Sequence, residues 1–446
     1  MGVPMLGYYS TSLSRGHLKN YFLDGCKKEA DFAVGVEWEK IGVLRESGEA
    51  IRYAGPRGVR AIFEALVQKN AWIPVFSAAG MPIALKKGTM SITLEPGGQV
   101  ELSGQKAKRL KDNADELYCH LKEIKEVSRP LDIVWLGLGA QPFSTAHDIE
   151  WVPKDRYDVM REKLQGRGAL TFSMMKETAS VQISLDYSSE SDAIEKLRLA
   201  MALSPVLTAL FANSPLEKGR GGPYLSRRAH IWRHTAPERS GIVWKVFDPS
   251  FTLEDYVEYA LDVPLLFLQR NDGWIGVGEL SFRDFLERGW KDLTPEPADW
   301  DLHLTSLFTE ARLKKYIEIR SVDCQTPPLG LAAVAFVKGL FYDADARRNA
   351  WKQLESWSLE ERKRLMDEVP VHGLQTKIRG AQLRQTAAVL AELAEQGLAP
   401  EERDHLKPMQ ELLGKGQNPA QKLLSCLQES PDPSAALPRL FECCEI

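Results

Sequence analysis

Alternating apolar and polar residues predict β-strands whose two faces differ sharply. Residues 32–39 read FAVGVEWE, so their apolar side chains share one side of a strand, and Glu37 and Glu39 share the other. Residues 91–103 (SITLEPGGQVELS) repeat this layout, with Glu101 opposite its apolar neighbours. A sheet built from such strands has one apolar side and one acidic side.

The same alternation occurs in other parts of the chain. In residues 316–320 (YIEIR) two isoleucines oppose Glu318 and Arg320, and Glu95 stands just before the Pro-Gly-Gly break between two polar stretches. Residues 179–187 (ASVQISLDY) alternate in the same way. We therefore expect separate segments to contribute polar side chains to one face of the sheet.

The order of helical and strand patterns predicts the fold class. The expected helices cover residues 18–25, 55–69, 104–129 and 191–213, and further strands cover 72–86 and 133–138. Because strands follow one another without regular βαβ alternation, we predict an α+β fold with a mostly antiparallel sheet. From residue 343 onward the strand signal stops and helices dominate, at 347–357, 358–368 and 378–397. This pattern predicts a catalytic domain over 1–342 and a helical subdomain over 343–446.

Composition narrows the classes of function. The chain of 446 residues has 57 basic and 61 acidic side chains and a net charge of −4, which removes the electrostatic case for nucleic-acid or anionic-membrane partners. Its longest apolar run, residues 329–337, is far shorter than the ~20 residues of a membrane span. The sequence shows no secretory signal pattern, and its six cysteines lack metal-ligand spacing. We therefore expect a cytoplasmic protein with reduced thiols, either a monomer or a homodimer.

The acidic side chains suggest a metal site. Each acidic strand taken alone fits an ordinary solvated face. Five carboxylates on one surface would repel one another, and divalent cations would relieve that repulsion. The set is Glu37, Glu39, Glu95, Glu101 and Glu318, with the amide of Gln182 beside it. Carboxylate and amide oxygens suit Mg²⁺ or Mn²⁺ rather than zinc, and several acids suggest more than one ion holding a nucleotide.

Basic side chains accompany these acids. Arg320 follows Glu318 by two residues and points into the same site, where a guanidinium suits the charge that develops during phosphoryl transfer. A surface ion pair between the two is the alternative. Arg161 in PKDRYDVMR and Arg228 in LSRRAHIW offer planar forks that match a carboxylate. From the residue pattern alone, solvated arginines are the favoured interpretation of both.

Several of these motifs together resemble a known family. The motifs are GVEWEKIG (35–42), SITLEPGGQVELSG (91–104), PKDRYDVMR (153–161), ASVQISLDYSSE (179–190), LSRRAHIW (225–232) and YIEIRSVD (316–323). They resemble the plant-type and bacterial glutamate–cysteine ligases over nearly the whole chain. The resemblance implies a curved, mostly antiparallel sheet like that of glutamine synthetase, with an acidic active-site face, flanking helices and a helical C-terminal region. It also implies ATP-dependent joining of the γ-carboxylate of glutamate to the amine of cysteine, the first step toward glutathione.

The resemblance further implies roles for single residues. It implies Mg²⁺ binding, with Mn²⁺ as an alternative, by Glu37, Glu39, Glu95, Glu101 and Glu318. It implies catalysis by Arg320 and Glu318, substrate binding by Arg161, Arg228, Thr178 and Gln182, and ATP binding by Lys40 and Arg320. Trp38 and the segment 178–182 depart from the family pattern, and we expect both to border the substrate pocket.

The implied reaction passes through γ-glutamyl phosphate, which the amine of cysteine then attacks. A loop around residues 214–224 is expected to act as a lid that excludes water. Two alternatives remain open. In the first, the ligase uses another amine as the acceptor. In the second, the chain is a catalytically silent nucleotide-binding relative.

Overall fold

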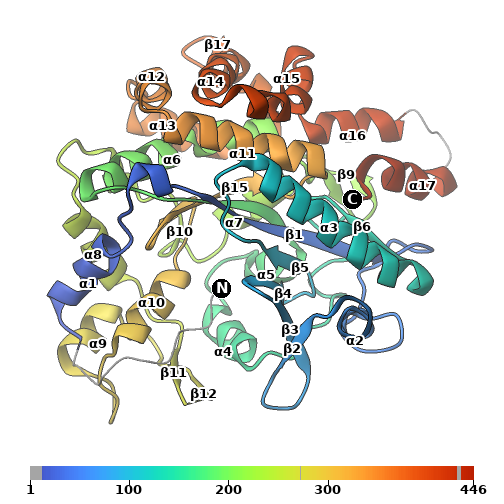
Figure 1. Cartoon of the computed structure of the whole chain (residues 1–446), viewed down its shortest axis with the longest axis horizontal. Coiled ribbons are helices and arrows are strands. Elements are labelled where there is room, and N and C mark those ends of the chain that lie inside the picture. Colours follow the sequence, from blue (N-terminus) through green and yellow to red (C-terminus); the bar gives the residue numbers. More distant parts are fainter. Residues whose placement is uncertain (1–12, 272, 429–432) are drawn as a thin grey trace.

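A nine-stranded antiparallel sheet forms the centre of the molecule (Figure 1). The computed structural model describes residues 13–271, 273–428 and 433–446. The strands run in the order β14 (Ala311–Leu313), β15 (Ile317–Asp323), β7 (Ser180–Leu185), β1 (Val34–Leu44), β5 (Val100–Ser103), β4 (Met90–Leu94), β3 (Pro82–Lys87) and β2 (Ile73–Phe76). The ninth strand, β6 (Ile133–Leu136), pairs with the second half of β1.

The register around β1 places the polar side chains of three strands side by side. Glu37 lies opposite Gln182 of β7 on one side and Ser103 of β5 on the other. Glu39 lies opposite Glu101 in the same ladder. Because strand residues alternate between faces, this register gathers the acids on one surface and confirms the expected polar face.

Three helices cover the opposite, apolar face of the sheet: α3 (Leu110–Ser128), α6 (Glu190–Phe211) and α11 (Pro327–Tyr342). They lie directly above the sheet in Figure 1. Trp38, Ile183 and Ile319 are buried in this layer. The backbone of α11 approaches Trp38 so closely that a Cβ at Gly330 would lie 2.7 Å from the indole ring. Glycine is therefore required at this point of the helix.

The remaining helices of the first 310 residues surround the polar face and the ends of the sheet. They are α1 (Arg15–Leu23), α2 (Val59–Asn70), α4 (Asp155–Leu164), α5 (Thr171–Glu177), α7 (Arg227–Arg233), α8 (Leu253–Asp262), α9 (Phe282–Arg288) and α10 (Pro297–Thr305). Short strand pairs connect them: β8 (Leu216–Glu217) with β9 (Arg220–Gly221), β10 (Ser240–Gly241) with β13 (Phe308–Thr309), and β11 (Leu268–Arg270) with β12 (Gly273–Ile275). No helix in the described ranges is both long and apolar enough to cross a bilayer.

The C-terminal part is helical and packs over α6 and α11 (Figure 1). It contains α12 (Ala344–Leu354), α13 (Leu359–His372), α14 (Leu383–Gly397), α15 (Lys407–Gly414), α16 (Pro419–Gln428) and α17 (Pro433–Cys444). The end of the chain returns to the sheet, where the amide of Gly137 donates to the carbonyl of Cys444 at 2.9 Å. The Sγ atoms of Cys426 and Cys443 lie 2.6 Å apart between α16 and α17. The proposed division at residue 342 stays a prediction.

Most expected elements are present, and the differences have local causes. The expected helix at 378–397 begins only at Leu383, because β16 (Lys377–Ile378) and β17 (Ala381–Gln382) pair as a small hairpin in front of it. Helices dominate after residue 343 as expected, and this hairpin is the strand pair there that the sequence pattern did not indicate. Helix α6 is capped by Ser189, whose Oγ accepts a hydrogen bond from the amide of Asp192 at 3.1 Å.

Candidate active site

The polar face of the sheet forms the floor of a pocket that opens to solvent. Four carboxylates line it, those of Glu37, Glu39, Glu95 and Glu101. Five cationic side chains also line it, those of Arg156, Arg228, Arg312, Lys314 and Arg320. Strands β1, β5, β7, β14 and β15 and the turn after β4 supply the floor, and helices α4, α5 and α7 supply the walls.

Hydrogen bonds fix two of the acids on the floor. Glu39 accepts from the Oγ of Ser180 at 3.1 Å and from the Nε2 of Gln182 at 3.0 Å. Glu101 accepts from Thr93 at 3.0 Å and from the neighbouring hydroxyl of Ser103 at 2.9 Å. All the donors lie on the same face of the sheet as the acids. The alternation in the sequence therefore positions the acids and their donors together.

Burial and mutual repulsion disfavour the charged forms of the central acids. Burial, followed by the charges of Glu101 and Glu318, raises the pKa of Glu37 to about 7. Burial, followed by the charges of Glu95 and Glu101, raises the pKa of Glu39 to about 8. A positive charge placed among these carboxylates would favour their ionised forms. The floor therefore has the electrostatics of a cation site.

The donor set fits Mg²⁺ although it forms no preassembled cage. Among the described residues, no three histidine, cysteine or acidic side chains lie close enough together to hold a metal as they stand. Magnesium commonly binds through one or two carboxylates, retained waters and the phosphates of a substrate. Four carboxylates spread over one floor suit that mode of binding, and their oxygen chemistry suits Mg²⁺ or Mn²⁺.

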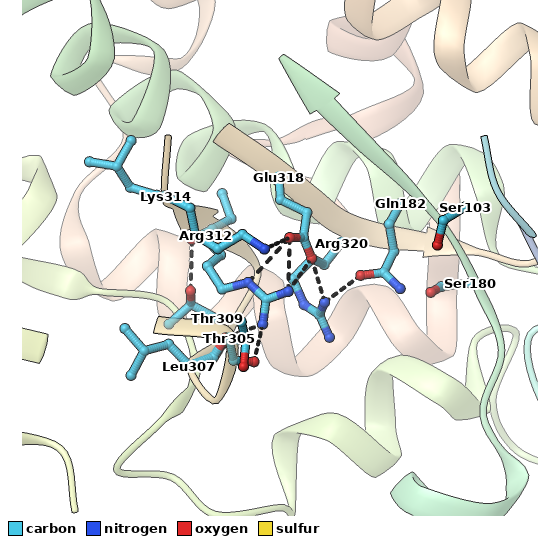
Figure 2. Close-up of polar contacts among 12 residues, drawn as sticks. Ser103, Ser180, Gln182, Thr305, Leu307, Thr309, Arg312, Lys314, Glu318 and Arg320 are labelled. Atoms are coloured by element: carbon cyan, nitrogen blue, oxygen red, sulfur yellow. Dashed lines mark hydrogen bonds and ion pairs between the residues drawn. The ribbon is translucent and has the colours of Figure 1, made fainter. Parts of the chain in front are cut away.

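Glu318 is not an open ligand on this floor, contrary to its expected role. Arg312 forms a bidentate ion pair with it, at 2.6 and 2.8 Å, and Arg320 donates to it at 2.7 Å (Figure 2). Lys314 lies 3.5 Å from the same carboxylate. Although burial opposes its charge, these three cations hold the pKa of Glu318 well below its usual range. The side chain is 1% exposed and does not line the pocket, so its expected metal and catalytic contacts are not supported.

Arg320 connects this cationic group to the acidic floor. Its Nη1 donates to Glu318 and, by a short contact, to the Oε1 of Gln182 (Figure 2). Gln182 donates in turn to Glu39. The guanidinium also lies 5.6 Å from the centre of the Trp232 ring, within the range of a cation–π contact. Arg320, Gln182 and Glu39 all line the pocket, as expected from the sequence.

Arg228 and Thr178 complete the part of the pocket that the sequence predicted. The Nη2 of Arg228 donates to the backbone carbonyl of Arg320 at 2.7 Å, and its Nη1 lies 3.8 Å from Asp323. Burial lowers the pKa of Arg228 from its usual value. The hydroxyl of Thr178 donates to the carbonyl of Met174 at 2.6 Å. Both side chains line the pocket and can contact a substrate.

Comparison with known proteins identifies the family. Residues 33–437 match the model of glutamate-cysteine ligase family 2. The chain is 38% identical over 432 residues to the chloroplastic glutamate–cysteine ligase B of Oryza sativa subsp. japonica, covering 94% of this chain and 86% of the relative. It is also 38% identical over 418 residues to the chloroplastic enzyme of Arabidopsis thaliana, covering 92% and 79%. The chain belongs to glutamate-cysteine ligase family 2.

A solved structure agrees with this membership at the level of the fold. The crystal structure of the glutamate–cysteine ligase of Francisella tularensis in complex with AMP has a TM-score of 0.55 and 14% identity, and the match covers 92% of this chain and 88% of that one. The expected fold class is confirmed. The expected activity, an ATP-dependent ligation of glutamate to cysteine at the first step of glutathione synthesis, is supported by the family match and the curated relatives.

The expected cellular compartment is contradicted by this comparison. The sequence predicted a cytoplasmic protein, but the curated plant relatives are named as chloroplastic enzymes, which contradicts that expectation. The prediction depended on a missing secretory signal. That absence separates secreted from unsecreted proteins and does not distinguish one internal compartment from another.

Three further residues of this ligase lie outside the pocket that the sequence assigned to them. Lys40 is fully buried on the far face of the sheet, where its Nζ donates to the carbonyls of Trp38 at 3.1 Å and Val100 at 3.3 Å. Its odd–even position relative to Glu39 already places it there. Trp38 shares that face and does not border the pocket. Arg161 lies on α4, half-exposed and 3.2 Å from Asp158.

The expected lid also lies elsewhere. Residues 214–224 form the β8–β9 hairpin, and the amide of Gly219 donates to the carbonyl of Pro142 at 2.8 Å. A Cβ at Gly221 would lie 3.1 Å from Leu424 of α16. None of the residues 214–224 lines the pocket. The hairpin therefore packs between the 142–143 turn and the C-terminal helices.

Sequence reasoning assigned no individual role to several residues that line the pocket, and for some of them a signal exists. Arg312 and Lys314 continue the two-residue period of YIEIR toward the N-terminus, in ARLKKYIEIR, and so share its polar face. Arg156 and Met160 lie four residues apart on one side of α4 and line the pocket, whereas Arg161 follows on the next side. Trp232 stands in the LSRRAHIW motif but has no periodic partner that would have indicated its place.

Proposed function

We propose that this chain joins the γ-carboxylate of glutamate to the amine of cysteine, using ATP and Mg²⁺ and passing through γ-glutamyl phosphate. The observation that carries the proposal is the pocket itself, in which four carboxylates on the floor face five cationic side chains. Such a site suits a metal-bound triphosphate and two amino acids, whose carboxylates need cationic partners.

Glu37, Glu39, Glu95 and Glu101 are the residues that would hold the metal. Bound there, Mg²⁺ ions would neutralise the phosphates of ATP and orient them for transfer. The raised pKa values of Glu37 and Glu39 support this role, because burial and the neighbouring carboxylates disfavour their charged forms and a bound cation would favour them. Mn²⁺ has the same preference for oxygen ligands and would serve as a substitute.

Arginines would bind and orient the reacting groups. Arg320 is fixed by Glu318 and Gln182 so that its guanidinium edge reaches the pocket, where it would stabilise the phosphoryl group in transit. Arg228 would bind a substrate carboxylate from the wall of the same pocket. Held side by side, the γ-carboxylate and the terminal phosphate react without the entropic cost of a free encounter.

The other part of the pocket is apolar and would protect the intermediate. Met174, Phe267 and Phe308 line it close to the polar floor. An acyl phosphate hydrolyses readily, so a wall that excludes water favours attack by the amine. The same wall would accommodate the short side chain of cysteine.

The test measures ADP and γ-glutamylcysteine with the purified chain. We expect both products to form only when glutamate, cysteine, ATP and Mg²⁺ are all present, in equal amounts. If product forms preferentially with another amine from a panel of acceptors, that amine is the acceptor in place of cysteine. No ADP with any acceptor, although the chain is folded, would contradict the proposal and favour a catalytically silent relative. Glu101→Gln is expected to remove turnover without unfolding the chain.

A further inference from the structure

Arg312 has no role in the proposed reaction so far. It lies on β14 directly opposite Glu318 of β15 in the antiparallel ladder. The two side chains are 7% and 1% exposed. Their pairing at the end of the sheet is therefore close, buried and set by the strand register.

The guanidinium of Arg312 contacts two different structures at once (Figure 2). Its Nε and Nη2 donate to the two oxygens of Glu318. Its Nη1 donates to the backbone carbonyls of Thr305 at 2.5 Å and Leu307 at 3.1 Å. All three guanidinium nitrogens of Arg312 take part in these contacts, and Nη2 is shared by both oxygens of Glu318. Arg312 is therefore bonded to its neighbours through every nitrogen.

Both of the structures that Arg312 holds belong to the pocket. Thr305, Ser306 and Phe308 of the loop after α10 line it. On the other side, Glu318 holds Arg320, Arg320 contacts Gln182, and Gln182 donates to Glu39 on the acidic floor. One buried side chain thus ties a wall loop to a continuous row of polar contacts that crosses three strands.

We propose that Arg312 is a positioning residue for phosphoryl transfer, which clamps Glu318 and the 305–308 loop so that Arg320 is held at the angle that transfer requires. The inference rests on the proposed function. Lysine cannot replace this clamp, because one ammonium cannot engage two carboxylate oxygens and two carbonyls in the geometry of a planar fork. The effect is expected in the chemical step and not in substrate binding.

The experiment compares Arg312→Lys with a matched control elsewhere in the molecule. Arg270 forms the same kind of clamp outside the pocket. It binds Asp299 through two parallel contacts of 2.6 and 2.7 Å and also donates to the carbonyls of Gln269 and Thr294. Arg270→Lys therefore reports the general cost of breaking a buried arginine clamp. Both variants are checked by circular dichroism and thermal unfolding before kinetics.

We expect Arg312→Lys to lower kcat by about 10- to 100-fold, the size of effect that misplacement of a catalytic group produces. The KM values for MgATP, glutamate and cysteine should stay within about threefold, because each nitrogen of Arg312 already bonds to Glu318 or to a backbone carbonyl. Arg270→Lys should keep the wild-type kcat even if its melting temperature falls as far as that of Arg312→Lys.

Three results would overturn the inference. The first is an unchanged kcat in Arg312→Lys, and the second is a fall in kcat that Arg270→Lys matches. The third is a fall in kcat/KM that arises wholly from KM, which would make Arg312 a substrate contact. If wild-type chain made no γ-glutamyl product, the proposed function would fail first. If wild type were active and Arg312→Lys were equally active, only the role of Arg312 would be refuted.

Discussion

Replacing Glu37 by glutamine should stabilise the metal-free protein at alkaline pH while removing its activity. Glu37 stands at the centre of the floor, opposite Gln182 and close enough to Glu101 and Glu318 for their charges to act on it. Glutamine has the same shape and no charge. The substitution therefore removes the repulsion and leaves the packing almost unchanged.

The size of the effect follows from the pKa of Glu37. Burial and the neighbouring carboxylates raise it from 4.5 to about 7. A folded-state pKa above the unfolded-state value means that stability is complete below pH 4.5 and is lost as the pH rises to about 7. A rise of roughly 2.5 units corresponds to about 3 kcal/mol. With an unfolding entropy of ~2.1 cal/mol/K per residue and 446 residues, this is a difference in melting temperature of ~3 °C.

Thermal unfolding in EDTA at pH 4.5 and pH 8 tests this reasoning. Wild-type protein should lose stability over that interval, and Glu37→Gln should lose about 3 kcal/mol less. Adding Mg²⁺ at pH 8 should raise the melting temperature of wild type more than that of the variant. Glu64→Gln is the control, because Glu64 is half-exposed on α2 and forms a surface ion pair with Arg60.

Two results would contradict the assigned repulsion. In one, the stability of wild type and that of Glu37→Gln change with pH in parallel. In the other, Glu37→Gln is less stable than wild type at pH 8. Either result would mean that other groups already compensate the charge of Glu37. If Glu37→Gln were stabilised but kept full ligase activity, repulsion would still explain its stability. Glu37 would then be excluded from the metal site.

Three further substitutions test how the structure redistributes the predicted roles. Arg161→Ala should leave every KM within about twofold in steady-state kinetics, because this side chain is half-exposed outside the pocket; a loss of amino-acid affinity would restore its predicted role. Lys40→Met should likewise leave the KM for MgATP unchanged, since Lys40 is buried on the far face of the sheet; a tenfold rise would contradict that placement. Arg228→Lys should raise the KM for one amino acid about tenfold with a smaller change in kcat, and equal KM values in both proteins would exclude a carboxylate contact.

Strand periodicity explains why the face of each acid could be predicted from sequence. Glu37, Glu39 and Glu101 are on the expected side because a strand reverses its side chains at every residue. The same rule placed Trp38 on the apolar side, and applied to Lys40 it gives the same face. The expectation that Trp38 borders the pocket came from the family pattern. The expected ATP contact at Lys40 came from family resemblance and not from this rule.

The structural environment of Glu318 could not be predicted from its own strand. What neutralises it is the pairing of β14 with β15, which sets Arg312 opposite it. Pairing is a tertiary property, and a sequence pattern shows which face a residue occupies but not what lies across from it. For Arg161 the difficulty was different. Helix α4 turns Arg156 toward the pocket, and a run of several basic residues does not show which one faces inward.

The burial of Glu318 changes how the charge of the site is divided. Arg312, Lys314 and Arg320 carry three positive charges around one carboxylate, so this edge of the pocket keeps a net charge of about +2. On the floor, burial and the neighbouring carboxylates raise the pKa values of Glu37 and Glu39 on β1. If Glu318 were an open ligand like the others, nothing on β15 would hold Arg320 in place. An ion pair inside the protein therefore gives the site two unlike edges. The anionic edge suits metal ions, and the cationic edge suits the phosphoryl group that those ions cannot surround alone.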